Sequence, residues 1–369
     1  MKIENDIKLG VSLYSYQDNY YFHKHDLEGC LAAAAGAGAT GIEVFSDAMI
    51  PEWPYISDEF VDHWNGMLQR YGLEAVCLDH FSDRAMWHNK LLTDDEMYER
   101  GVMYLKAAQK LGCKYIRLLH DAHIGKGISA YELSTPAIVE RLLPVAQECN
   151  VIMALECHAP SGVDDPVQEE YLEAAYRLNI PYVGLQADFS TYEYCMSSAD
   201  LELCVYKGCT RKVLEHLRCK QRESYFSGKP FVFEDIQDDF KNMILSEEDK
   251  KYLDPTSFVY SDSSKFVGGN VYDGKFKQSN WEEDYKTLQN YASKLVYCHA
   301  KFYDINEDGQ VDNMDYPRIF DALKKGGYKG YVCSEFEGNR RLNVIGWCDE
   351  ISYVNKQHKL MRKCLGYNE

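Results

Sequence analysis

Short apolar runs rich in β-branched and aromatic residues alternate along the chain with longer segments of helical periodicity. This alternation is typical of a parallel sheet whose strands are joined by crossover helices. Eight runs are predicted as strands: Lys8–Tyr14, Gly41–Phe45, Glu74–Leu78, Tyr115–Leu119, Val151–Glu156, Tyr182–Ala187, Leu295–His299 and Gly330–Glu335.

Helical periodicity follows most of these runs, and the segment ending at Leu111 stops before Gly112, a residue suited to a helix C-terminus. Eight strand–helix units in order are the count of a (β/α)8 barrel, so we expect one α/β TIM-barrel domain over residues 1–369. The predicted helices are Asp26–Ala39, Asp58–Tyr71, Asp94–Leu111, Thr135–Cys149, Pro166–Leu178, Pro317–Lys325 and about Asp349–Leu365.

The regular spacing breaks once, between the sixth and seventh strands, where residues 189–294 exceed the length of an ordinary βα unit. Two helical stretches are predicted there, Asp200–Arg222 and Glu234–Leu253, followed by the polar, turn-rich segment Ser261–Ser279. Because the insertion follows a strand, it must lie over the C-terminal face, where barrel active sites are found. We interpret residues 189–294 as a lid or a subunit interface within a single domain.

Nine of the 29 tyrosines of the chain fall in this insertion, and six of them are candidates for a particular role. They suit either stacking on a flat aromatic ligand or partner, or ordinary amphipathic packing. They are Tyr192, Tyr194, Tyr225, Tyr252, Tyr260 and Tyr272.

Charge and cysteine usage narrow the function classes. Lys and Arg number 40 against 58 Asp and Glu, a net charge of −18, which argues against a nucleic-acid binder because such a protein needs a basic surface. Thirteen cysteines stand singly, without a CxxC pair, as in a reducing cytoplasm. No signal-peptide core and no membrane-length apolar run is evident. We therefore expect a cytoplasmic enzyme of small molecules, without nucleic-acid or membrane partners.

Four residues with metal-ligating side chains end the last four predicted strands: Glu156, Asp188, His299 and Glu335. Barrel strands deliver such side chains to the active face. Three carboxylates and one imidazole suit Mn²⁺ or Mg²⁺, whereas zinc usually takes more nitrogen or sulfur. Taken singly, an Asp after a strand often caps a helix and a strand-end Glu is often solvated. Their occurrence on consecutive strands favours a metal site, and its excess negative charge favours a neutral sugar over a phosphorylated one.

Two further residues are candidates for the catalytic chemistry. His158 lies two residues after Glu156, so strand alternation would point both side chains into the site, and an imidazole suits proton abstraction near neutral pH. The alternative for His158 is a hydrogen bond to a loop carbonyl. Lys301 shares a strand face with His299 and could hold a substrate hydroxyl or a developing oxyanion, the alternative being an ordinary surface lysine.

Four more residues are candidates for substrate binding. Glu337 could ligate the metal in place of Glu335, or it could orient a metal ligand without contacting the metal itself. Arg340 could pair with Glu337. His80 and His120 follow the third and fourth strands and either line the pocket or serve the structure.

On these residues the chain resembles the xylose-isomerase-like barrel superfamily of sugar isomerases and epimerases, over nearly its whole length outside the insertion. The resemblance implies Glu, Asp, His and Glu metal ligands on the last four strands, which map onto the four residues above. The H-x-K of His299 and Lys301 and the E-x-E-G of Glu335 to Gly338 also match. Many epimerases of the superfamily carry D-x-x-H after the sixth strand, but here Thr191 stands in the His position, which argues against a plain ketose 3-epimerase.

Shorter motifs resemble the larger subunit of bacterial C-glycoside deglycosidases: LGVSLYSYQ, MIPEWP, the E-x-H-A-P of Glu156 to Pro160, and D-F-S after the sixth strand. Those subunits are similar barrels that act on 3-oxo-glycosides together with a small β-sandwich subunit. The resemblance therefore implies a 3-oxo-glycoside or other sugar substrate and a small β-rich partner in a hetero-oligomer.

The leading hypothesis is a lyase in which a metal polarises the ketone of a 3-oxo-C-glycoside, a base removes the proton at C2, and the aglycone leaves C1. The alternative is an aldose–ketose isomerase or epimerase, in which the proton returns to the sugar. Two hypotheses from other classes are weaker. An endonuclease of abasic DNA needs more His ligands and a basic groove, and the complete ligand set argues against a non-catalytic binding subunit.

Overall fold

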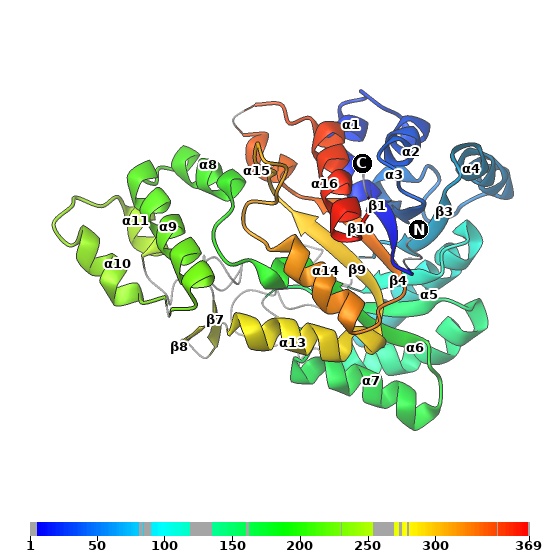
Figure 1. Ribbon diagram of the computed structural model, residues 1–369. Helices are drawn as coiled ribbons and strands as arrows, with labels where there is room; N and C mark the ends of the chain where they lie inside the picture. The colour runs from blue at the N-terminus through cyan, green and yellow to red at the C-terminus, as the bar shows by residue number, and fades with distance from the viewer. Residues whose placement is uncertain are drawn as a thin grey trace.

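Eight parallel strands close into a barrel, as the sequence pattern predicts (Figure 1). The computed structural model describes residues 6–80, 84, 90–118, 135–159, 162–229, 231–253, 269–272, 275–278, 280–344 and 346–367. The ring order is β1-β10-β9-β6-β5-β4-β3-β2, closed where β1 pairs with both β10 and β2. The strands are β1 (Lys8–Ser12), β2 (Gly41–Val44), β3 (Glu74–Leu78), β4 (Tyr115–Leu118), β5 (Ile152–Cys157), β6 (Val183–Asp188), β9 (Leu295–Phe302) and β10 (Tyr331–Phe336).

Helices pack around the outside of this barrel, and their ends follow local sequence signals. The longest, α5, begins at a capping box made by Thr93 and Glu96, and ends at Gly112, whose φ of 78° a side chain would disfavour. These helices are α2 (Leu27–Gly36), α4 (Asp58–Tyr71), α5 (Asp94–Leu111), α6 (Thr135–Cys149), α7 (Pro166–Leu178), α13 (Trp281–Tyr291), α14 (Tyr316–Lys325) and α16 (Glu350–Cys364). Shorter turns of helix are η1 (Leu13–Tyr16), α1 (Gln17–Tyr21), α3 (Ser46–Met49), η4 (Ala292–Lys294) and α15 (Asn339–Leu342).

The barrel interior is layered because inward-facing side chains recur at every second strand position. One layer is a small cluster of apolar and aromatic side chains that includes Cys77, Tyr115, Ala154, Tyr297 and Cys333. Two residues further along the same five strands stand Asp79, Arg117, Glu156, His299 and Glu335, all buried. The apolar layer therefore supports a charged layer toward the C-terminal ends of the strands.

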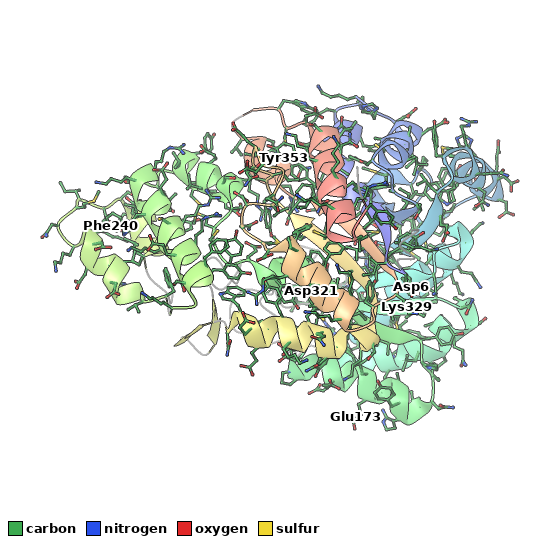
Figure 2. All side chains as sticks on the ribbon, viewed as in Figure 1. Asp6, Glu173, Phe240, Asp321, Lys329 and Tyr353 are labelled. Atoms are coloured by element: carbon green, nitrogen blue, oxygen red, sulfur yellow. The ribbon has the colours of Figure 1, made fainter. Side chains whose placement is uncertain are left out.

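The insertion after β6 builds a second, smaller core outside the barrel. Its elements are η3 (Phe189–Tyr192), α8 (Ser198–Tyr206), α9 (Arg211–Ser227), α10 (Phe233–Phe240), α11 (Glu247–Tyr252) and the antiparallel pair β7 (Gly269–Tyr272) and β8 (Lys275–Gln278). Apolar side chains from α8 to α11, among them Leu214, Leu217, Ile236 and Phe240, form a cluster separate from the barrel core. These helices project to one side of the barrel in Figure 1, and Phe240 is labelled there in Figure 2.

The two long helical stretches predicted in the insertion are wrong in extent, because each is broken in the middle. Asp200–Arg222 is interrupted between α8 and α9, where Gly208 adopts a φ of 109°. Glu234–Leu253 is interrupted between α10 and α11, where a capping box from Ser246 starts a new helix. Residues 281–291, part of the insertion to which no element was assigned from the sequence, form α13, which buries Tyr285 and Leu288 in the barrel core.

Four of the six candidate tyrosines in the insertion are buried against the chain itself, namely Tyr192, Tyr194, Tyr225 and Tyr252. Tyr192 stacks on Tyr285 with ring centres 5.6 Å apart, and Tyr194 stacks on Tyr225 at 4.3 Å. For these residues packing is the better interpretation. Tyr260 lies outside the described residues, and Tyr272 falls in β7. Within the described part of the chain, no helix has both the length and the apolar character needed to cross a membrane.

Candidate metal centre

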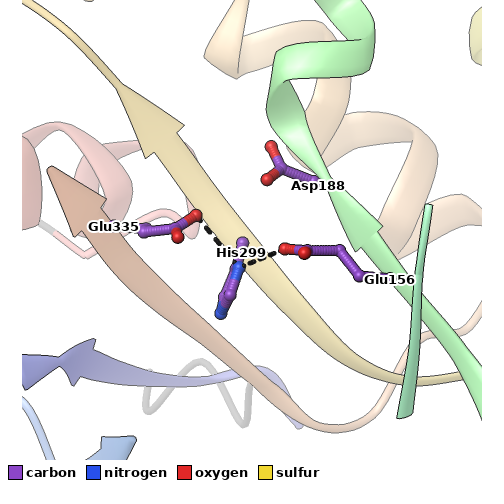
Figure 3. A group of neighbouring side chains, drawn as sticks. All are labelled: Glu156, Asp188, His299 and Glu335. Carbon is purple, nitrogen blue, oxygen red and sulfur yellow. Dashed lines mark hydrogen bonds and ion pairs between the residues drawn. The ribbon is translucent and has the colours of Figure 1, made fainter. Parts of the chain in front are cut away.

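The four predicted metal ligands meet at the mouth of the barrel (Figure 3). They stand on four strands that are neighbours in the ring, β5, β6, β9 and β10. All four are buried, and one potential ligand atom from each lies within 4.8 Å of the others. The sequence prediction that these residues share one site is therefore matched by the geometry.

His299 uses its two ring nitrogens in different directions. Its Nδ1 faces the cluster, 2.7 Å from Oε1 of Glu156 and 3.0 Å from Oε2 of Glu335. Its Nε2 lies 2.8 Å from Oε2 of Glu43, a fully buried residue of β2. Burial disfavours a charge on His299, but the three surrounding carboxylates outweigh it and raise the pKa of the imidazole well above its usual value.

Two buried cations compensate part of the negative charge. Arg117 on β4 donates from Nε to Asp79 and from Nη1 to Glu156, both at 2.6 Å. Although burial acts against ionisation, Arg117 and His299 hold the pKa of Glu156 well below its usual range. Burial dominates at Asp79 instead and raises the pKa of that carboxyl to about 7.

Lys301 is the second cation, and its Nζ lies 2.8 Å from Glu335, 3.3 Å from Glu337 and 3.6 Å from Asp188. Burial opposes ionisation of Glu335, but His299 and Lys301 lower the pKa of this carboxyl to about 2. At Asp188 burial prevails over Lys301 and raises the pKa. Asp188 is therefore the ligand whose negative charge is least compensated by the chain.

The donor set fits a divalent cation. Oδ1 of Asp188 caps η3 by accepting from the amide of Ser190 at 2.7 Å, whereas its buried Oδ2 has no hydrogen-bond partner among the described residues. Oε2 of Glu335, by contrast, lies 2.8 Å from Nζ of Lys301 and 3.0 Å from Nδ1 of His299. A buried carboxylate oxygen without a donor is costly, and a bound cation would satisfy Oδ2 of Asp188. Asp188 thus caps η3 through one oxygen and leaves the other available to a cation.

The structure places His158 just beyond β5, half-buried, with Nδ1 2.7 Å from the carbonyl oxygen of Ala159. This is the loop-carbonyl contact foreseen as the alternative to a catalytic role. His158 nevertheless lies close enough to the cluster for its charge to act on Glu156, Asp188 and Glu337. The contact with Ala159 and a position beside the metal centre therefore coexist.

Glu337 and Arg340 lie together beside Lys301. Tyr14 joins them, because its hydroxyl donates to Glu337 at 3.3 Å and accepts from Nη1 of Arg340 at 2.5 Å. Burial opposes the charge of Glu337, but Arg341, Lys301 and other cations hold its pKa far below the usual range. The Arg340 side chain is more than half exposed at the edge of this group.

His80, His120 and Thr191 are the remaining positions that were singled out from the sequence. His80 is buried and its ring lies 3.8 Å from that of Tyr104, and burial lowers its pKa well below the usual value. His120 lies outside the described residues. Thr191, in the position where related epimerases carry His, donates its hydroxyl to the carbonyl oxygen of Cys157 at 3.1 Å.

Sequence reasoning missed Glu43, Asp79, Arg117 and Tyr14. Glu43 and Arg117 are single charges inside otherwise apolar strands, which is a recognisable signal because such residues are rarely buried without a partner. The pattern does not tell which residue the charge meets. Tyr14, in an apolar run, carries no comparable signal.

Known proteins with similar sequences or structures indicate the same fold. Residues 31–201 match the family described as xylose isomerase-like TIM barrel. The chain is 28% identical to the C-glycoside deglycosidase alpha subunit of Arthrobacter globiformis, covering 97% of this chain and 92% of that protein. It is 26% identical to the 3'-dehydrocarminate deglycosidase alpha subunit of a Microbacterium species, covering 97% and 95%.

Solved structures share the fold at low sequence identity. An L-ribulose 3-epimerase aligns with a TM-score of 0.54 and 12% identity, over 98% of this chain and 95% of that one. A structure of IolI protein with a bound zinc atom aligns with a TM-score of 0.53 and 14% identity, over 97% and 98%. The fold is therefore a TIM barrel similar to those described as xylose isomerase-like. Among such barrels, this chain is a distant, full-length homologue of C-glycoside deglycosidase alpha subunits.

Proposed function

We propose that this chain is the catalytic subunit of a divalent-metal-dependent C-glycoside deglycosidase that cleaves the C–C bond of 3-oxo-C-glycosides. The observation that carries the proposal is the alignment of 97% of the chain with two deglycosidase alpha subunits. The buried Glu156, Asp188, His299 and Glu335 cluster supports it, because the reaction requires a polarised ketone. When bound there, Mn²⁺ or Mg²⁺ supplies this Lewis-acid polarisation.

His158 is the proposed base. The contact of Nδ1 with the carbonyl oxygen of Ala159 requires a proton on Nδ1, so in the neutral ring the lone pair is on Nε2. Nε2 would take the proton from C2 of the sugar. The C–H electron pair forms an enolate, then the C1=C2 double bond, and the C1–aglycone bond breaks. The aglycone carbon leaves with that bonding pair and takes up a proton, so neither water nor an oxidant is consumed.

Lys301 is proposed to hold developing negative charge on the substrate. Its ammonium group lies between Asp188, Glu335 and Glu337, at the rim of the ligand cluster. Glu337 and Arg340 would contact sugar hydroxyls, since both lie beside Tyr14 at the edge of this cluster. His80 and His120 remain predictions for substrate contact.

A partner subunit follows from the same relationship, because both relatives are named as alpha subunits. We propose a small β-rich partner and interpret residues 189–294 as a lid or as the surface that meets it. The separate core of α8 to α11 supports this, since it gives the insertion a body of its own beside the barrel mouth.

The test is turnover by the chain purified with its natural partner and loaded with Mn²⁺. We expect release of the aglycone from a 3-oxo-C-glucoside and no epimer from free ketoses. His158→Ala should keep its metal content and lose about 10²–10⁴-fold in turnover, the usual contribution of general-base catalysis. The surface variant His63→Ala is the control. Epimer formation without aglycone release would instead support the isomerase or epimerase alternative.

A further inference from the structure

We propose that Glu43 is a positioning residue for the metal centre, which holds His299 with Nδ1 directed at the ion. This inference rests on the metal centre of the proposed function and adds a residue that gives no ligand itself. Glu43 stands on β2, across the barrel from β9, and is fully buried. Its Oε2 lies 2.8 Å from Nε2 of His299.

His299 needs such a partner because of the chemistry of its imidazole ring. A neutral imidazole carries one N–H donor and one lone pair, and a metal ligand must offer the lone pair. In this site Nδ1 is the nitrogen that faces Glu156 and Glu335, so Nδ1 must be the ligand atom and Nε2 must carry the hydrogen. An ionised carboxylate only accepts hydrogen bonds, so Glu43 stabilises this tautomer and disfavours the other.

The pairing of β2 is irregular next to Glu43. Pairing of β2 with β3 shifts register between Ile42 and Glu43, whereas on the other side Glu43 pairs regularly with Ser12 of β1. Such an irregularity re-aims the side chain that follows it. The second oxygen of Glu43, Oε1, is buried without a hydrogen-bond partner among the described residues. Among the described residues, this carboxylate therefore makes its hydrogen bond and ion pair with His299 alone.

Two variants separate orientation from charge. Glu43→Gln removes the negative charge but keeps an oxygen that can accept from Nε2–H. Glu43→Ala removes both. If Glu43 acts by orienting His299, the Gln variant should resemble the wild type, and if it acts only as a negative charge, both variants should be impaired alike.

The experiment is calorimetric titration with Mn²⁺ alone of the full chain after its metal has been removed with a chelator. We expect Glu43→Ala to raise the Kd for Mn²⁺ about 10–100-fold, the usual effect of losing such a contact, and Glu43→Gln to stay near the wild-type value. Glu350→Ala is the matched control, because Glu350 is a buried carboxylate that holds Asn19 and Asn339 instead of a ligand. This control should lose stability without a change in Kd. Should Glu43→Ala not fold, Glu43→Asp replaces it, since its shorter side chain cannot span the same distance.

A second measurement reads the tautomer directly. In ¹⁵N spectra of histidine-labelled protein with a fixed, limiting amount of Mg²⁺, the fraction of His299 protonated only at Nε2 should be the same in Glu43→Gln as in the wild type and lower in Glu43→Ala. Wild-type affinity in Glu43→Ala, or equal loss in the Gln and Ala variants, would overturn the inference. So would a wild-type chain that binds no Mn²⁺. Intact Mn²⁺ binding without aglycone release would contradict the proposed reaction and leave this inference standing.

Discussion

At the scale of single residues, burial decides which charges this molecule tolerates. In the barrel mouth each buried carboxylate lies near a cation or imidazole, as Glu156 does near Arg117. Outside it, His358 on α16 is fully buried, and its Nε2 donates to the carbonyl oxygen of Gly10 at 3.2 Å. Burial is the main reason that the pKa of His358 falls from 6.5 to about 4.

This histidine predicts a loss of stability in mild acid. The unfolded chain takes up a proton near pH 6.5, whereas the folded chain does so only near pH 4, so the unfolded state binds more protons between these values. The contribution of His358 is therefore complete above about pH 6.5 and is lost as the pH falls toward 4. We expect the free energy of unfolding to decrease over this range by up to about 3 kcal/mol on account of His358.

Denaturant unfolding at several pH values checks this expectation. His358→Gln keeps a side-chain donor for Gly10 and should have a shallower slope than the wild type between pH 4 and 6.5. His63→Gln, on the exposed side of α4, is the control and should keep the wild-type slope. An unchanged slope in His358→Gln would contradict the prediction.

At the scale of elements, the short helix α15 depends on close contact with the barrel. Gly338 precedes it, and a Cβ there would lie 1.9 Å from the carbonyl oxygen of Tyr303 and 2.7 Å from a ring carbon of Phe336. Because backbone cannot yield as a flexible side chain does, α15 would have to move. This helix carries Arg340 and Arg341, both of which approach Glu337.

We therefore expect Gly338→Ala to cost at least about 1–3 kcal/mol in unfolding free energy, as overpacked sites do, and to impair substrate binding. Thermal unfolding and KM measure the two effects. The control is Gly66→Ala in α4, where no described atom outside the adjoining helix backbone lies within 4 Å of the added Cβ. It should be neutral or stabilising by roughly 0.5–1 kcal/mol, because alanine favours a helix over glycine. Equal stability of both variants would refute the packing argument.

The same scale shows what sequence pattern can and cannot predict. All eight barrel strands were predictable, because a parallel strand buried on both faces reads as an apolar run. In the insertion, apolar spacing continues across Gly208 and Ser246, so periodicity alone fused separate helices. The helices are separated by the backbone conformation of Gly208 and by the cap at Ser246. Whether such a local signal ends a helix depends on how the flanking segments pack, which the sequence pattern does not show.

Prediction of the site has a similar limit. The four ligands follow from their places at strand ends, because a barrel gathers those ends at one face. Glu43 could not be assigned in this way. Its partner His299 lies 256 residues further along the chain, and only the closed ring of strands brings them together.

At the scale of the whole molecule, two hydrophobic cores share one chain. Leu217 on α9 belongs to the insertion core and Leu288 on α13 to the barrel core, and both are fully buried. If the insertion unfolds as a unit of its own, damage to its core should stay local.

Hydrogen exchange tests whether the insertion unfolds separately from the barrel. Leu217→Ala, expected to cost about 2–5 kcal/mol locally, should speed exchange in α8 to α11 and leave the barrel strands and the Mn²⁺ affinity unchanged. Leu288→Ala removes the same atoms from the barrel core and should speed exchange in the barrel strands. Faster exchange throughout the chain in Leu217→Ala would indicate one cooperative unit.

Arg341 links the insertion to the candidate metal centre. Its guanidinium pairs with Glu337 through Nη1 at 3.2 Å and with Asp200 of α8 through Nε at 3.1 Å. One side chain therefore connects a residue beside the ligand cluster to the first helix of the insertion. If Glu337 contacts the sugar as proposed, any protein that displaced α8 on docking would alter the affinity for the sugar. Thermodynamic reciprocity then requires that the sugar change the affinity for that protein by the same factor.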